Sequence, residues 1–357
     1  MTVHTDCTYF RGDIPCRPHK LHGVHCDNCK YYQPLSKTIL IIKLGAVGDV
    51  IRTTPLLHRI RKEYPEAAIW WLTLTPEVVP SVVNTVLRFS TEALVILQAM
   101  KFDMLINLDK DREACALANL IEAKEKKGFI LSGSGKPKPV DNNAEHKFIT
   151  GIFDDISQAN TKSYLEEIYE ICGWEFDGEE YILDSTAYIG EVIPNNGKKI
   201  IGLNTGCGDR WISRLWEFAR WEDLIMRLKE NDYFPILLGG NQEYEKNVEL
   251  SEKTGAYCPA PRKLPDFTAL MRECDVIVTG VTMALHLGIG LQKRLVVMNN
   301  IFNSHEFELY GRGEIIQPTR ECKCYFKQSC TNSEYKCMEH LSVEQILSAI
   351  ERQILTL

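Results

Sequence analysis

The stretch IIKLGAVGDVIRTTP, Ile41–Pro55, decides the fold of this chain. An apolar run leads into a turn that contains Gly45 and Gly48, and an amphipathic segment follows. A buried strand, a glycine-containing turn and a helix are the opening unit of a doubly wound α/β domain. The turn does not bind a nucleotide by a known fingerprint, because G-x-G-x-x-G is incomplete and the Lys-Ser or Lys-Thr pair of a P-loop is missing.

Asp49 is the unusual residue of this turn, because an acid is a poor neighbour for a phosphate. One interpretation makes it the N-cap of the following helix, where its carboxylate accepts from free backbone N–H groups. The other makes it a general base that takes a proton from an attacking sugar hydroxyl. The two roles are compatible.

The same alternation of apolar runs and amphipathic segments continues along the chain and predicts parallel sheets with helices between the strands. We expect strands at 37–44, 67–74, 102–109, 199–204, 233–238, 274–280 and 294–300, and helices at 55–65, 221–231, 284–292 and 342–355.

The chain is long enough for two domains. A polar, Cys-rich module is expected at 1–36, a first Rossmann-like domain at 37–190, a second at 198–340 and a C-terminal helix at 341–357. The turn around Pro194 and Gly197 marks the boundary between the two domains. We expect these domains to face each other and to bind ligands in the cleft outside the carboxyl ends of their strands.

Composition and charge exclude several classes of protein. No run approaches 18 uncharged apolar residues, and the N-terminus lacks the basic and apolar regions of a signal peptide. We therefore expect a cytoplasmic protein, and peripheral work at the inner face of the cytoplasmic membrane is compatible with this. The net charge of −7 disfavours nucleic acid as a partner.

Eight of the 13 cysteines form two clusters, which in a cytoplasmic protein favour metal ligands or buried thiols over disulfides. A metal would explain how a module of about 36 residues folds without a core of its own. We expect a structural zinc, with iron as the alternative, and reduced free thiols remain the competing interpretation. The clusters are Cys7, Cys16, Cys26 and Cys29, and Cys322, Cys324, Cys330 and Cys337.

Several segments together resemble glycosyltransferase family 9, the ADP-heptose:lipopolysaccharide heptosyltransferase family. The stretch that begins IIKLGAVGDVIRTTPLLHRI resembles the N-terminal signature of the family, with Lys, Gly-Asp-Val and Thr-x-Pro at the family spacing. NTGCGDRWISRLWEF with the later GGNQE resembles its donor-binding segment, and VTMALHLGIGLQKRLVV and HEFELYGRG resemble the segments that follow. The resemblance covers roughly residues 37–357.

The resemblance implies a GT-B fold, in which the first domain binds the acceptor and the second binds the nucleotide sugar. It also implies transfer with inversion, a carboxylate base and no catalytic metal. Asp49 matches the family's Gly-Asp motif and inherits the role of base. The acceptor side is expected at Lys43, Gly48, Arg52 and Thr53, although Lys43 could equally face the sheet edge.

On the donor side, the resemblance assigns the diphosphate turn to Thr205 and Gly206, a leaving-group cation to Arg214 and a ribose contact to Glu243. Arg214 as an exposed surface residue and Glu243 as a helix-start acid are the simpler alternatives. His286 either contacts the diphosphate or is structural. The full set of expected donor-binding residues is Thr205, Gly206, Arg214, Trp216, Glu243, Thr282, Met283 and His286.

One position departs from the family pattern: Val281 stands where many members have an Asp that contacts the donor sugar. Unless Thr282 or the backbone of 281–283 replaces that contact, the donor differs from the usual heptose or is a hexose. Several family members also carry a Cys-rich segment before the last helix, and in some it coordinates a metal. The usual C-x2-C opening is C-x-C here, at Cys322 and Cys324.

The leading hypothesis is an inverting transferase that moves a heptose from ADP-heptose to a glycan, lipopolysaccharide-type or protein acceptor. A second is a non-catalytic nucleotide- or glycan-binding protein with a structural metal module, which Val281 favours and intact Asp49, Arg214 and Glu243 oppose. A third, a nicotinamide-dependent oxidoreductase, is weakened by the incomplete dinucleotide fingerprint.

Overall fold

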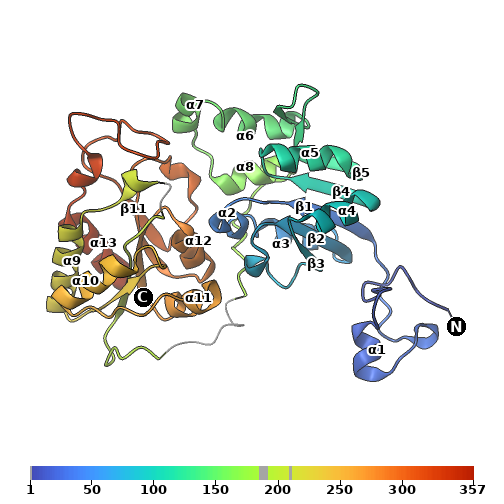
Figure 1. Cartoon of the computed structure of the whole chain (residues 1–357), viewed down its shortest axis with the longest axis horizontal. Coiled ribbons are helices and arrows are strands. Elements are labelled where there is room, and N and C mark those ends of the chain that lie inside the picture. Colours follow the sequence, from blue (N-terminus) through green and yellow to red (C-terminus); the bar gives the residue numbers. More distant parts are fainter. Residues whose placement is uncertain (1, 185–191, 209–210) are drawn as a thin grey trace. The chain divides into compact units, whose positions relative to one another are not determined.

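The computed structural model describes residues 2–184, 192–208 and 211–357. The chain divides into two compact units, each built on one sheet (Figure 1). Unit 1 comprises Met1–Ala46, Thr53–Phe148 and Ile168–Glu175, and unit 2 comprises Val47–Arg52, Ile149–Glu167 and Phe176–Leu357. The chain thus enters unit 2 briefly, directly after Ala46, and brings Asp49 with it. The domain boundary predicted at residue 190 lies outside the described residues.

Unit 1 contains a six-stranded sheet with the order β3-β2-β1-β4-β5-β6, parallel except for β6, which pairs antiparallel with β5. The strands are β1 Lys37–Ile42, β2 Ala67–Thr73, β3 Thr85–Arg88, β4 Lys101–Asn107, β5 Glu122–Leu131 and β6 Pro137–Pro139. The central strand β1 is buried along its last four residues, so it reads as a continuous apolar run.

One face of this sheet packs against α4 and α5. Alternate residues of β1, Leu40 and Ile42, point to this face and join Leu97 of α4 and Leu117 of α5 in one apolar cluster. The helices of the unit 1 sequence region are α1 Arg17–His22, α3 Leu56–Glu63, α4 Thr91–Ala99, α5 Arg112–Leu120 and α6 Glu145–Thr150. Within the Cys-rich module, α1 and a 3₁₀ turn at Cys26–Asn28 are its helical elements among the described residues.

Unit 2 contains a five-stranded sheet with the order β11-β10-β9-β7-β8, and all its pairings are parallel. The strands are β7 Ile200–Asn204, β8 Phe234–Leu238, β9 Val276–Gly280, β10 Arg294–Met298 and β11 Gly313–Ile316. The predicted α/β class with two Rossmann-like sheets is therefore confirmed.

The core of unit 2 lies between one face of the sheet and the helices α9, α10 and α13 (Figure 1). Trp221 of α9, Leu250 of α10 and Ile346 of α13 meet Leu203 of β7 there. The helices of the unit 2 sequence region are α2 Val47–Ile51, α7 Asp154–Ala159, α9 Phe218–Glu230, α10 Tyr244–Thr254, α11 Leu264–Arg272, α12 Met283–Gly290 and α13 Val343–Ile354. Helix α8, Tyr164–Ile171, begins in unit 2 and ends in unit 1.

The predicted C-terminal helix starts where its sequence indicates. Ser342 caps α13, accepting from the N–H of Gln345, and the Gln345 side chain accepts from the N–H of Ser342. In the described parts of the chain, no helix is both long and apolar enough to cross a bilayer.

Candidate functional site

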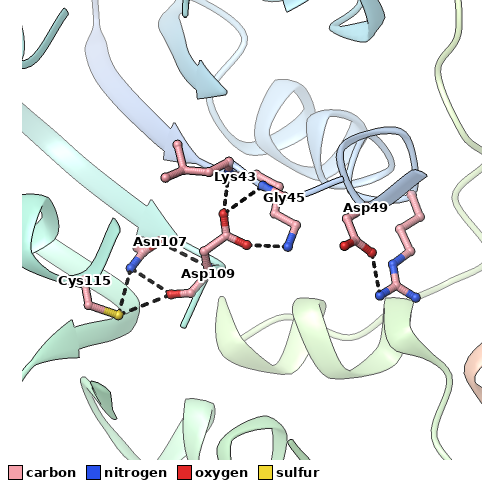
Figure 2. A network of polar contacts seen from close by, with 8 residues as sticks. Lys43, Gly45, Asp49, Asn107, Asp109 and Cys115 are labelled. Atoms are coloured by element: carbon pink, nitrogen blue, oxygen red, sulfur yellow. Dashed lines mark hydrogen bonds and ion pairs between the residues drawn. The ribbon is translucent and has the colours of Figure 1, made fainter. Parts of the chain in front are cut away.

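Asp49 lies in the first turn of the five-residue helix α2, two residues after its first residue Val47. It therefore does not occupy the N-cap position. About a third of its side chain, 35%, is exposed, and its Oδ1 lies 2.8 Å from Nη2 of Arg52 (Figure 2). A carboxylate that is both ion-paired and open to solvent can meet a reactant, as a general base must.

Arg52, predicted on the acceptor side, has its charge engaged by two carboxylates, those of Asp49 and Glu306. Its side chain is only 14% exposed, and Nη1 lies 2.7 Å from Oε1 of Glu306. Its guanidinium carbon lies 3.7 Å from the ring centre of Tyr164. Thr53, another residue predicted on the acceptor side, is fully buried. Both side chains are therefore largely withdrawn from solvent.

Gly48 is the point at which α2 packs on α12. A Cβ atom at Gly48 would lie 2.5 Å from Cδ2 of His286, closer than side chains tolerate. His286 is buried, and its ring stacks on Tyr181 at 6.3 Å. Burial, with a smaller contribution from Arg52, lowers the pKa of His286 to about 3. This histidine is therefore neutral at physiological pH, and its visible role is structural.

Lys43 belongs to unit 1 and is held by Asp109, a residue that the sequence analysis did not select (Figure 2). Its Nζ lies 2.5 Å from Oδ1 of Asp109, and both side chains are buried. The other oxygen, Oδ2, accepts from the N–H groups of Leu44 and Gly45. Lys43 thus lies at the carboxyl end of β1, where its ion pair with Asp109 holds the start of the turn.

The carboxyl end of β7 carries the predicted diphosphate turn. A Cβ atom at Gly206 would lie 2.1 Å from Cγ and Oε1 of Glu243, so only glycine lets the turn approach this carboxylate. Glu243 Oε2 accepts from the N–H of Gly240 at 2.9 Å. Thr205 is buried and donates from its hydroxyl to Asn247 Oδ1 at 2.6 Å. Turn and acid are therefore neighbours, as the assignment requires.

Lys246 adds a cation to this turn that the sequence analysis missed. Its Nζ donates to the carbonyl oxygen of Thr205 at 2.8 Å. Burial lowers the pKa of its ammonium group, against the opposing effect of Glu243 and Cys207. The available signal was its position three residues after Glu243, which places both on one side of a helix.

Arg214 is buried rather than exposed, which removes the simpler of its two interpretations. It ends the 3₁₀ turn Ile212–Arg214, and its Nη2 donates to the carbonyl oxygen of Cys207 at 3.2 Å. Its guanidinium carbon lies 5.4 Å from the ring centre of Phe302, and burial lowers its pKa. A poorly solvated cation on this turn is well suited to attract a diphosphate.

Trp216 lies in the core of unit 2, in contrast to its predicted contact with the donor. It is 4% exposed, packs edge-on against Trp221 at 5.0 Å, and donates from its indole N–H to the carbonyl oxygen of Leu341. It anchors the segment after Arg214 without offering its ring to a ligand.

Thr282 caps α12 and accepts from the N–H of Ala284. Its Oγ1 also accepts from Nδ2 of Asn204 at 3.2 Å and lies 3.1 Å from Oγ1 of Thr279, which donates to the Gly280 carbonyl. Asn204 Nδ2 carries two hydrogens and has three acceptors in reach, so it donates to two of them at a time. Thr282 thus lies within a network of internal hydrogen bonds at the position next to Val281. Met283 begins α12 and is half-buried.

Asn204, at the end of β7, connects these pieces and was not predicted. Its Nδ2 also lies 3.2 Å from the carbonyl oxygen of Gly206 and 3.0 Å from Oγ1 of Thr279. A chain of contacts therefore runs from Gly48 through His286 and α12 to Thr282, and from there through Asn204 to Gly206. All these residues belong to unit 2.

The predicted metal sites are not confirmed. In the described ranges, no group of three or more His, Cys, Asp and Glu side chains is arranged to hold a metal ion. The C-terminal cysteines are free thiols that contact one another in two pairs. Cys324 and Cys330 have sulfurs 3.6 Å apart, and a hydrogen bond from Cys322 lowers the pKa of Cys337. The cysteines of the N-terminal module are partly exposed free thiols.

Comparisons with known proteins identify the family and the fold of the chain. The model of glycosyltransferase family 9 (heptosyltransferase) matches residues 95–336, more than half of the chain. No curated protein matches the sequence. A family 9 glycosyl transferase from Veillonella parvula matches in structure with a TM-score of 0.68 and 17% identity, over 90% of this chain and 98% of that one.

Two further solved structures hold nucleotide sugars. E. coli heptosyltransferase WaaC with ADP-2-deoxy-2-fluoro heptose matches with a TM-score of 0.61 and 15% identity, over 88% of this chain and 99% of that one. The dodecameric, iron-containing heptosyltransferase TibC of enterotoxigenic E. coli, in complex with ADP-D-β-D-heptose, matches with a TM-score of 0.56 and 11% identity, over 90% and 77%. The predicted GT-B-like fold is confirmed by these likenesses, and the chain belongs to glycosyltransferase family 9 and is a glycosyltransferase.

Proposed function

We propose that this glycosyltransferase transfers a sugar with inversion and uses Asp49 as the general base. The observation that carries the proposal is the chain of contacts from α2 to the β7 turn. It begins at Gly48, next to the partly exposed carboxylate of Asp49, and reaches the turn of Gly206 and Glu243 within one compact unit.

The proposed reaction is a single displacement. The Asp49 carboxylate takes the proton of an acceptor hydroxyl as its oxygen bonds to the anomeric carbon of the donor. The bond between that carbon and the diphosphate oxygen breaks, and the nucleoside diphosphate leaves with the electron pair. Attack on the face opposite the leaving group inverts the anomeric centre.

The charge that develops on the leaving group needs a nearby cation. Arg214 and Lys246 meet that need, because both lie against carbonyl groups of the β7 turn and both are poorly solvated. Glu243, which follows β8, would accept from the ribose hydroxyls. The proposed chemistry is complete with these side chains and requires no catalytic metal.

We propose ADP-heptose as the donor, because two solved relatives are described with ADP-heptose compounds. Val281 has no polar side-chain group for the usual sugar contact, so Thr282 or backbone groups of 281–283 would have to hold the sugar. A buried sugar hydroxyl without a hydrogen-bond partner costs about 1–3 kcal/mol, which makes another heptose or a hexose the alternative donor. The proposed acceptor is a glycan, a lipopolysaccharide-type molecule or a protein, reached in the cytoplasm or at the inner membrane face.

We further propose that Cys322, Cys324, Cys330 and Cys337 hold one structural metal ion, zinc or iron. A tetrahedral zinc with bonds of about 2.3 Å separates its sulfurs by roughly 3.8 Å, close to the 3.6 Å between Cys324 and Cys330. Thiolates are also stabilised by N–H donors, and Thr331 N and Asn300 Nδ2 lie 3.2 and 3.3 Å from sulfurs of the cluster. The ion would brace the loop and take no part in transfer.

A panel of ADP, GDP, UDP, CDP and NAD tests the nucleotide assignment by thermal shift. A ligand at about 100 times its dissociation constant adds roughly 2.7 kcal/mol, which is a readable shift. We expect a shift with ADP, followed by release of ADP from ADP-heptose. A shift with GDP or UDP alone would replace the donor, and no shift with any nucleotide would favour the non-catalytic hypothesis.

A further inference from the structure

Arg52 is a cation held between two acids. It directly follows α2, three residues after Asp49, and its two terminal nitrogens reach different carboxylates. Nη2 lies 2.8 Å from Asp49 Oδ1, and Nη1 lies 2.7 Å from Oε1 of Glu306, on the 3₁₀ turn Ser304–Glu306. A planar guanidinium can serve two partners in fixed directions, which an ammonium group cannot.

The third surface of this guanidinium is closed by Tyr164, whose ring centre lies 3.7 Å from the Arg52 guanidinium carbon. Such stacking favours a positive charge. Burial opposes that charge, but Asp49 and Glu306 outweigh burial and raise the pKa of Arg52. Arg52 is therefore a permanent positive charge next to Asp49.

Stability alone is a weak reason for this arrangement. Buried ion pairs often stabilise a protein no more than apolar residues of the same size. In the described part of the structure, the buried Nε–H of Arg52 also has no hydrogen-bond partner, which costs about 1–3 kcal/mol. The exposures differ in a way that suggests a function: 35% of the Asp49 side chain is open, but only 14% of Arg52. A substrate can therefore reach Asp49, and Arg52 would act on the substrate through Asp49.

We propose that Arg52 is a positioning residue for Asp49, and that Glu306 anchors Arg52 in this role. Arg52 fixes the Oδ1 atom, and thus the direction of the carboxylate, and keeps the carboxylate ionised until the acceptor hydroxyl gives up its proton. This inference rests on the proposed role of Asp49 as the base, and it replaces the expected contact between Arg52 and the acceptor.

The other groups that face Arg52 carry no charge near neutral pH and so do not weaken its interaction with Asp49. His286 is uncharged, because burial and the nearby Arg52 lower its pKa to about 3. Burial raises the pKa of Tyr181, although Arg52 opposes this, so Tyr181 is uncharged as well. Tyr164 contributes its ring face. Asp49 and Glu306 are thus the two carboxylates that Arg52 contacts.

The test compares Arg52→Gln and Arg52→Lys with a matched control, Arg312→Gln. Arg312 also pairs with a carboxylate, Glu180, at 2.7 and 2.6 Å, and also lies over a tyrosine ring, that of Tyr310. It makes no described hydrogen bond or ion pair with Asp49. The readouts are the pH profile of kcat/KM for ADP release from ADP-heptose, the affinity for ADP, and the carboxyl titration of Asp49 by ¹³C NMR.

In Arg52→Gln, we expect the acid limb of the pH profile and the Asp49 titration to move to higher pH by about 1–3 units, because the adjacent cation is removed. We expect kcat to fall because the base is no longer held in position. ADP affinity stays at the wild-type value, and KM therefore does not rise. Arg52→Lys keeps the charge and shifts less, and Arg312→Gln keeps the wild-type profile. Arg52→Lys also serves as the test if Arg52→Gln does not fold.

An Asp49 titration and acid limb that remain unchanged in both Arg52 variants would overturn the inference. The NMR titration needs no turnover, so its result is independent of the proposed function. If Asp49→Asn retains turnover while Arg52→Gln still shifts the titration, the base assignment fails and the link between Arg52 and Asp49 stands.

Discussion

Gly206 shows how a single atom constrains the proposed donor site. The turn after β7 can approach Glu243 because position 206 has no side chain. Lys246 and Arg214 then donate to the carbonyl groups on either side, those of Thr205 and Cys207. Sequence spacing indicated the glycine and the acid, but the contact between them is visible only in the fold.

Replacing Gly206 with Ala should displace Glu243, because the new Cβ would lie 2.1 Å from its carboxylate. We expect ADP to bind about tenfold or more weakly, since a loss of 1.4 kcal/mol corresponds to that factor. Stability should change little, because the end of a flexible, partly exposed Glu243 side chain can move aside. Isothermal titration with ADP measures the effect.

Gly240→Ala is the matched control. Its Cβ would lie 3.6 Å from Oε2 of Glu243, an ordinary contact, and its N–H to that oxygen is retained. If Gly206→Ala and Gly240→Ala bind ADP with equal affinity, the proposal that Glu243 contacts the nucleotide is wrong.

His286 makes the packing of α2 on α12 dependent on pH. Its folded pKa of about 3 lies below the ordinary value of 6.5, so the unfolded chain binds a proton more readily. Stability from this residue is complete above pH 6.5 and decreases as pH falls towards 3, by about 1.4 kcal/mol per pH unit. Urea unfolding between pH 7.5 and 5 measures the decrease.

In His286→Gln this part of the pH dependence should disappear, whereas the exposed His58→Gln should retain it. A wild-type slope in the His286 variant would mean that this imidazole is protonated in the folded protein.

At the scale of elements, short connections carry the proposed chemistry and regular elements position them. α2 has five residues, and it is fixed by contacts distant in sequence, to His286 and Glu306. The loop of the C-terminal cysteines lies against the turn of Arg214: Ser213 donates to the carbonyl groups of Lys327 and Gln328. The cysteine loop therefore braces the segment that carries the proposed leaving-group cation.

If the C-terminal cysteines hold a metal, the purified full chain should contain about one zinc or iron ion at this site. Cys330→Ser should abolish metal binding and lower the melting temperature, and Cys258→Ser, outside both clusters, should not. Elemental analysis by mass spectrometry measures the content. A metal-free but folded wild type would contradict the proposal, and a metal that is absent only from Cys29→Ser would move the site to the N-terminal module.

Features that depend on neighbouring residues could be predicted from the sequence, whereas contacts between residues far apart in the sequence could not. The run into Gly48 and Asp49 predicts strand, turn and helix because periodicity and glycine act over a few residues. Asp109 and Glu306 could not be assigned, because the former reaches Lys43 from 66 positions away and the latter reaches Arg52 from 254. Trp216 matched a motif, but its large apolar ring is used in the core.

At the scale of the whole molecule, the proposed base and the proposed donor residues belong to one compact unit. Val47–Arg52 is grouped with the C-terminal half of the chain, although β1 before it and α3 after it belong to unit 1. The contacts between α2, α12 and the β7 turn are therefore internal to unit 2. The base and the donor turn can therefore be tested with the donor alone.

The most direct test of the account is the slow hydrolysis of ADP-heptose by wild type and Asp49→Asn, in which water takes the heptose in place of the acceptor and ADP is released. ADP affinity is measured in parallel. The account predicts that Asp49→Asn binds ADP like the wild type and loses turnover by about 10²–10⁴-fold, the usual contribution of a general base. Turnover retained in a folded Asp49→Asn variant would contradict it.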